Sequence, residues 1–85
     1  MNKGDIINIL DKGYIVLAVK SISDKNYALI TEFDANINFK EKTIKDADID
    51  LKKALLVSFD IEANSINFET DINIISELIE CIYEN

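Results

Sequence analysis

The chain has 85 residues, of which 48% are hydrophobic and 29% are charged, and its formal net charge is −7. A chain of this length and composition folds around one core, which excludes a second domain and a disordered chain. No apolar run approaches the roughly 20 residues of a membrane helix. Arginine, which pairs with phosphates and guanine, is absent. We therefore expect no direct binding to nucleic acid and no membrane insertion.

The cellular setting is suggested by the cysteine content and by the first residues. A single cysteine, Cys81, excludes an internal disulfide. Residues 1–10 have neither the apolar run nor the small-residue cleavage site of a signal peptide. Both features favour a cytoplasmic protein. Abundant isoleucine, asparagine and lysine are typical of an A/T-rich genome, such as that of a low-GC bacterium or one of its phages.

The first part of the chain predicts a three-stranded antiparallel meander. Its strands are expected at residues 5–10, 14–22 and 27–33, with turns at 11–13 and 23–26. The first turn contains Gly13, which can take a positive φ at no steric cost. The second strand is apolar at nearly every early position, which indicates a central strand covered on both faces.

The middle of the chain predicts one further strand, at residues 37–44. We interpret residues 44–53 as a loop with a helical turn, and a strand or a helix over these residues is the alternative. This segment carries aspartates at every second position: Asp46, Asp48 and Asp50. A calcium-binding loop that began at Asp46 would need glycine and glutamate where the chain has Leu51 and Val57. We therefore expect no metal site there, and we interpret the aspartates as a solvated surface.

The last part predicts two strands and a helix. The strands are expected at 54–62 and 66–69, with a turn at 63–65. The helix is expected over 70–85, with Thr70 or Asp71 as its N-cap and its end near Tyr83. Its apolar stripe recurs at helical spacing: Ile72, Ile75, Ile79 and Ile82, widened by Ile74 and Leu78.

These elements predict a mainly β (α+β) fold. We expect a small twisted antiparallel sheet, or an SH3-like barrel, of five to six strands with one C-terminal α-helix packed on it. Residues 1–85 would form a single domain, with the sheet in 1–69 and the helix in 70–85.

Charge is distributed unevenly along the chain. Residues 1–53 contain all nine lysines and nine acidic residues, so they are neutral, whereas residues 54–85 contain seven acidic residues and no lysine. The seven acidic residues are the candidate partner-binding residues: Asp60, Glu62, Glu69, Asp71, Glu77, Glu80 and Glu84. Glu80 and Glu84 lie near the helix C-terminus, where the dipole favours cations. We expect no lysine from the rest of the fold to lie over this acidic third.

The favoured function is a non-enzymatic, acidic protein-interaction module that binds a basic partner surface. A concrete version is a phage or mobile-element inhibitor that mimics nucleic-acid phosphates. The alternative is a small-molecule-binding or sponge protein with a pocket between sheet and helix, lined by Tyr14, Tyr27, Phe33 and Phe59. The acidic third could also serve solubility alone.

The sequence lacks the residue types and motifs that most enzymes use for catalysis. The chain has no histidine to shuttle protons near neutral pH, and no phosphate-binding glycine loop or Cys/His metal cluster. Cys81 has no basic neighbour in sequence to activate it, so we interpret it as a half-buried structural residue. We therefore expect no enzyme activity, no cofactor and no metal.

Overall fold

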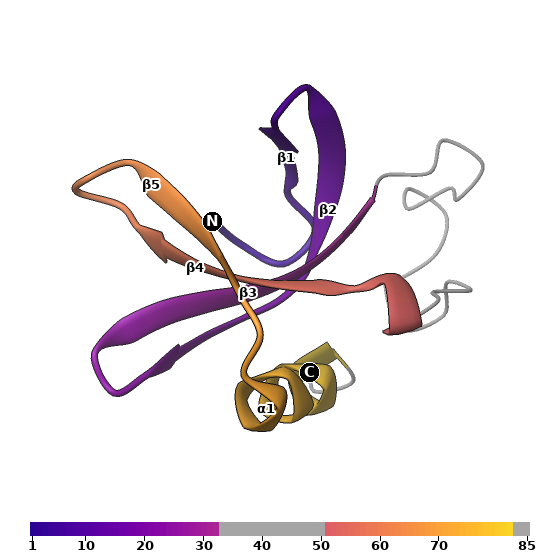
Figure 1. The fold of residues 1–85 in the computed structure, drawn as a ribbon, viewed down its shortest axis with the longest axis vertical. Coiled ribbons are helices and arrows are strands. Elements are labelled where there is room, and N and C mark those ends of the chain that lie inside the picture. Colours follow the sequence, from indigo (N-terminus) through magenta and orange to yellow (C-terminus); the bar gives the residue numbers. More distant parts are fainter. Residues whose placement is uncertain (33–50, 83–85) are drawn as a thin grey trace.

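In the described part of the chain, five strands form one antiparallel sheet in which each strand pairs with its neighbours along the chain, in the order β1-β2-β3-β4-β5. The computed structural model describes residues 1–32 and 51–82. The sheet is curled into a half-barrel, and one C-terminal helix packs against it (Figure 1). The predicted mainly β fold is confirmed. Its elements are β1 (Ile6–Ile9), β2 (Lys12–Ile22), β3 (Lys25–Glu32), the 3-10 turn η2 (Leu51–Lys53), β4 (Leu55–Asp60), β5 (Ser65–Glu69) and α1 (Ile72–Ile82).

The centre of the sheet is buried on both faces, as the unbroken apolar run in β2 predicted. Residues 14–18 of β2 and 27–30 of β3 are all buried. The register between these strands shifts between Val16 and Ala18, which marks a β-bulge. A bulge bends its strand and increases the local twist, which helps a sheet of this size to curl.

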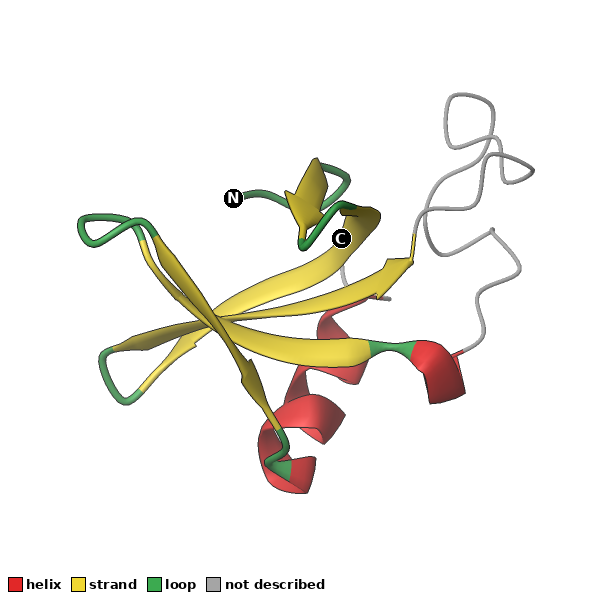
Figure 2. Cartoon of the chain, turned by 45° about the horizontal axis from the view of Figure 1, so that its top comes forward, coloured by secondary structure: helices red, strands yellow, loops and turns green. Residues whose placement is uncertain are grey.

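The helix covers one face of the sheet (Figure 2). Leu78 and Ile82 of α1 are fully buried against a cluster that includes Leu17, Leu29 and Leu56 from three strands. The predicted apolar stripe is confirmed for most of its length, although its first residue, Ile72, is 76% exposed. Cys81 is half-buried beside this cluster, as expected for a structural cysteine.

The opposite face has a second, smaller core. It contains Tyr14, Val16, Ala28, Ile30 and Val57, and Met1, Ile7, Ile9, Val19 and Phe59 pack against it. In Figures 1 and 2 the chain's N-terminus lies on the side of the sheet away from α1. The N-terminal segment therefore covers part of the face that the helix leaves open.

Two hairpin turns differ in detail from the prediction. Leu10 and Asp11 take positive φ values of 50° and 67°, and Ser23 and Asp24 take 51° and 64°. These are the backbone conformations of two-residue type I′ turns, whose twist matches that of the flanking strands. The predicted turn at 11–13 is therefore wrong, because Gly13 already lies within β2.

Three expectations on the middle segment are not tested. The predicted strand at 37–44, the aspartates Asp46, Asp48 and Asp50, and residue Phe33 lie outside the described residues. The described end of the segment, Leu51–Lys53, is the short helical turn η2 directly before β4. Within the described part of the chain, no helix has the length and apolar content needed to cross a membrane.

Candidate functional site

The β4–β5 hairpin is a poorly covered part of the described sheet. Within residues 1–32 and 51–82, β5 pairs with β4 on one side and has no strand on its other side. None of the five β5 residues is buried. The hairpin also carries several large apolar side chains that are at least 39% exposed: Leu55, Ile61, Ile66 and Phe68.

The strand register places most of these apolar side chains on one face. Phe68 lies opposite Val57, and Ile66 lies opposite Phe59, so each pair shares a face of the sheet. Val57 is fully buried in the core on the face away from the helix. β5 thus extends this apolar face beyond the covered core. We refer to Leu55, Ile66 and Phe68 as the apolar edge.

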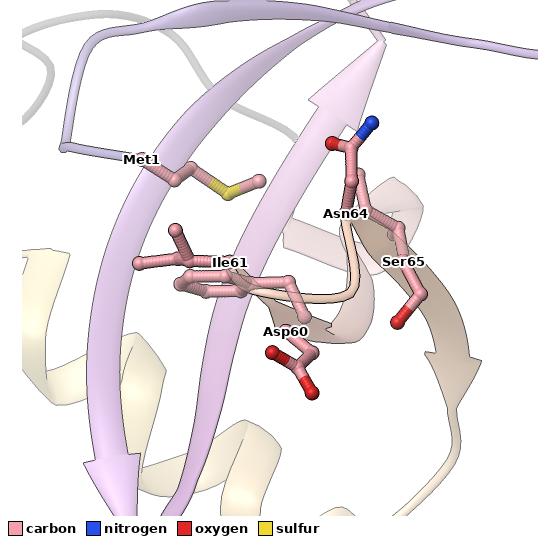
Figure 3. A pocket seen from close by; sticks show the side chains of 7 residues that line it. Met1, Asp60, Ile61, Asn64 and Ser65 are labelled. Atoms are coloured by element: carbon pink, nitrogen blue, oxygen red, sulfur yellow. The ribbon is translucent and has the colours of Figure 1, made fainter.

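A small hollow lies at the turn of this hairpin (Figure 3). Its volume is about 180 Å³. Met1 and Ile61 lie side by side in it, and the carboxylate of Asp60 points away from them. Its other lining residues are Phe59, Asn64, Ser65 and Ile66. Pockets for small organic ligands usually have about 300–1,000 Å³, so this hollow is too small for most of them.

The residues proposed for a pocket between sheet and helix do not come together. Tyr27 packs in the core beneath the helix. Tyr14 and Phe59 lie in the core on the opposite face of the sheet. The expectation that these three side chains line one pocket is therefore wrong. Tyr27 lies opposite Ser58 in the strand register, so the next residue of β4, Phe59, faces the other side of the sheet. The fourth residue, Phe33, lies outside the described residues.

Two of the candidate acidic residues lie at the β4–β5 turn. One carboxylate oxygen of Asp60 accepts hydrogen bonds from the backbone N–H groups of Glu62, at 3.0 Å, and Ala63, at 3.2 Å. This arrangement is an Asx turn, which replaces backbone pairing where the strand ends. Both Asp60 and Glu62 are exposed. The carboxylate of Asp60 therefore orders the turn and keeps its charge at the surface.

Glu69, at the end of β5, is paired with a lysine from another hairpin. Its Oε1 accepts a hydrogen bond from the Ser58 hydroxyl at 2.7 Å and lies 3.0 Å from Lys25 Nζ. The Ser58 hydrogen bond and the Lys25 ammonium lower the pKa of Glu69 below its ordinary value. The hydrogen bond to the Glu69 carboxylate and its negative charge raise the pKa of Lys25. The Lys25 ammonium also lies 5.6 Å from the centre of the Tyr27 ring. The expectation that no lysine lies over the acidic third is wrong at Glu69.

The remaining acidic residues belong to the helix. Asp71 is the N-cap, because its Oδ1 accepts hydrogen bonds from the N–H groups of Asn73, at 2.9 Å, and Ile74, at 3.3 Å. Glu77 and Glu80 are exposed on α1. Glu84 lies outside the described residues.

The helix C-terminus has the cation that its own sequence lacks. Lys3 Nζ donates a hydrogen bond to the carbonyl oxygen of Ile82 at 2.6 Å. This contact satisfies one terminal carbonyl and places positive charge at the negative end of the dipole. The sequence argument that this helix end is left uncompensated is therefore wrong, because the compensating lysine comes from the opposite end of the chain.

The acidic side chains form two groups rather than one continuous row. Asp60 and Glu62 lie at the turn before β5, and Glu69 and Asp71 lie at its other end, followed by the helix. The ends of a five-residue strand are roughly 13 Å apart. Among the described acidic residues of this region, Glu69 alone forms a salt bridge with a lysine. The apolar edge is thus flanked by acidic groups at both ends.

The acidic residues are evident from the sequence, whereas the apolar edge is not. The alternation in "SINFE", residues 65–69, shows that Ile66 and Phe68 share a face. It cannot show whether another element covers that face, because this depends on the position of the strand in the sheet.

No cluster of metal-ligating side chains adds to this site within the described part of the chain. In the ranges 1–32 and 51–82, no three His, Cys, Asp or Glu side chains are grouped so that they could hold a metal ion. Comparison of the chain with protein-family models, with curated proteins and with solved structures finds no significant match. The functional interpretation therefore rests on the geometry of the β4–β5 hairpin.

Proposed function

We propose that the chain is a non-enzymatic protein-interaction module that binds a basic partner through the β4–β5 hairpin. The observation that carries this proposal is the apolar edge, with Phe68 half-exposed on a strand that has acidic groups at both ends. Protein interfaces commonly have an apolar, aromatic-rich centre and a charged rim. The β4–β5 hairpin carries both an apolar centre and charged groups at its ends.

The charge supports the choice of a basic partner. The excess of seven negative charges lies in residues 54–85, and one of its described members, Glu69, is neutralised by Lys25. A field of one sign accelerates encounter with a partner of opposite sign and rejects like-charged surfaces. The apolar edge would supply contact area, and the acidic ends would supply orientation and selectivity.

Mimicry of nucleic-acid phosphates is a narrower version of this proposal. It requires the acidic residues themselves to supply most of the binding, so affinity should fall steeply with salt. An interface centred on the apolar edge would retain more affinity as salt rises, because apolar contacts are not screened. Salt dependence therefore separates the two versions.

The test is affinity capture from a host lysate with four matched baits beside the wild type. Phe68→Ser removes the exposed aromatic ring, and Glu62→Lys reverses one charge at the turn. Leu10→Ser, at a site that is 88% exposed on another turn, and Glu32→Lys, in the neutral half, are the controls. We expect a basic partner that the wild type and both controls retain and that the two hairpin variants lose.

The proposal fails if the hairpin variants and the controls retain the same proteins in the same amounts. It also fails if the partner that depends on the hairpin is acidic.

A further inference from the structure

We infer that the free edge of β5 binds an extended partner segment with alternating basic and apolar side chains, through strand-to-strand backbone pairing. This inference rests on the proposed function and specifies how the same hairpin recognises its partner. β-strand addition of this kind takes affinity from main-chain hydrogen bonds and specificity from alternate side chains.

Among residues 1–32 and 51–82, no strand pairs with the outer side of the β5 backbone. Its residues pair with β4 in an unbroken register from Leu56↔Glu69 to Asp60↔Ser65, without a bulge. An edge strand in that state presents a row of backbone N–H and C=O groups on its free side. Natural edges are usually blocked by proline, lysine, a bulge or a covering element. β5 has none of the first three, and its apolar side chains are exposed.

The side chains of β5 indicate the chemistry of the incoming segment. Ile66 and Phe68 point to the face away from the helix, and Ser65, Asn67 and Glu69 point to the helix face. A segment laid along β5 alternates in the same way. Its apolar side chains would extend the apolar edge, and its basic ones would lie on the face that carries Glu69. Lysines near its ends would also approach the acidic groups that flank β5.

A second copy of this chain is a poorer occupant of the edge. An antiparallel pairing centred on Asn67 would place Ile66 opposite Phe68 of the other copy, which is favourable. It would also bring the turn with Asp60 and Glu62 of one copy toward Glu69 and Asp71 of the other. Like charges at adjacent strands oppose pairing. Charge complementarity therefore favours a basic segment.

The inference is tested with three peptides of equal charge: Lys-Val-Lys-Val-Lys-Val-Lys, the block isomer Lys-Lys-Lys-Lys-Val-Val-Val, and Lys-Val-Lys-Pro-Lys-Val-Lys. Binding to the full chain is measured by isothermal titration at low salt and at about 0.15 M salt. Amide hydrogen exchange then locates the contact. The protein variants are Phe68→Ser and, as a control, Leu10→Ser.

We expect the alternating peptide to slow exchange at β5 amides and to bind at least about tenfold more tightly than the block and proline peptides. Proline in place of the central valine removes a backbone N–H and leaves the charge unchanged, so weaker binding of this peptide than of the alternating one supports strand pairing. Phe68→Ser should weaken the alternating peptide by about tenfold, and Leu10→Ser should leave its affinity unchanged.

Three results would overturn the inference. Equal binding of all three peptides, without protection of β5, would agree with the proposal of a basic partner but would exclude strand addition. Absence of binding by every peptide, even at low salt, would overturn the proposed function as well. Sedimentation showing self-association that Phe68→Ser abolishes would identify a second copy as the occupant.

Discussion

The β2–β3 and β4–β5 hairpins are both rich in apolar side chains, and they differ in what covers these side chains. In β3, four consecutive residues, Tyr27–Ile30, are buried, whereas no residue of β5 is. The difference follows from position in the sheet. β3 has a strand on each side and a core on each face, and β5 lies at an edge beyond the second core. In a half-barrel, sheet order decides which apolar face becomes core and which remains available for a partner.

The largest expected effect comes from truncating one apolar side chain in each hairpin. Leu29→Ala empties a fully buried site beneath the helix and should lower the free energy of unfolding by about 3 kcal/mol. Phe68→Ser changes a half-exposed site and should cost about 1 kcal/mol or less. Urea denaturation of both variants measures the contrast. Similar losses for the two would show that β5 is part of the folding core rather than a free surface.

The turns of the two hairpins should respond in opposite directions. Asp24 holds a φ of 64°, which a non-glycine residue adopts at a cost, so Asp24→Gly should raise the free energy of unfolding by about 1 kcal/mol. Asp60→Ala removes the acceptor for two backbone N–H groups and should lower it by about 1 kcal/mol. Thermal unfolding at neutral pH measures both. A loss of stability in Asp24→Gly would argue against the type I′ geometry.

Loss of the contact between Lys3 and the Ile82 carbonyl at the end of the helix should have a smaller effect on stability. Lys3→Met keeps most of the aliphatic stem and removes the ammonium that contacts the Ile82 carbonyl. We expect a loss of about 0.5–1 kcal/mol that shrinks as salt rises, because a helix-terminus charge interaction is screened. Lys12→Met, in an exposed part of β2, is the matched control. An equal loss in both variants would mean that lowered charge, and not the helix contact, is responsible.

The smallest effect on stability is expected from the ion pair between Lys25 and Glu69, which joins the two hairpins. The folded-state pKa of Glu69 lies below its ordinary value of 4.5, so its bonds with Ser58 and Lys25 stabilise the fold above that pH. This stabilisation is lost as the pH falls below 4.5 through the lowered pKa. Glu69→Gln should therefore be less stable than the wild type at neutral pH, and the difference should vanish in acid. A difference that does not change with pH would contradict the assigned ion pair.

Local patterns were sufficient to predict much of the fold. The alternation in β3 and β4, the apolar run in β2 and the helical spacing of the isoleucines each specify an element within a short window of sequence. Asp71 could be named as one of two possible caps for the same reason. The turn residues were less accessible, since Leu10 and Asp11 lack the glycine that usually marks a type I′ turn.

The candidate site was only partly predictable, because its decisive features are contacts between distant segments. Lys25 reaches Glu69 across the sheet, and Lys3 reaches the end of the helix from the other end of the chain. Neither contact leaves a signal in local spacing. The exposure of Phe68 also depends on the absence of a neighbouring strand within the described sheet, which no local pattern reports.

Amide hydrogen exchange of the two edge strands, with and without the alternating lysine–valine peptide, tests the central claim most directly. The account predicts slower exchange in β5 and unchanged exchange in β1. The side chains of Ile7 and Ile9 in β1 pack against the second core, and lysines accompany the acidic residues at both ends of this strand. Equal protection of both edges, or protection confined to β1 or α1, would contradict the assignment of β5 as the binding edge.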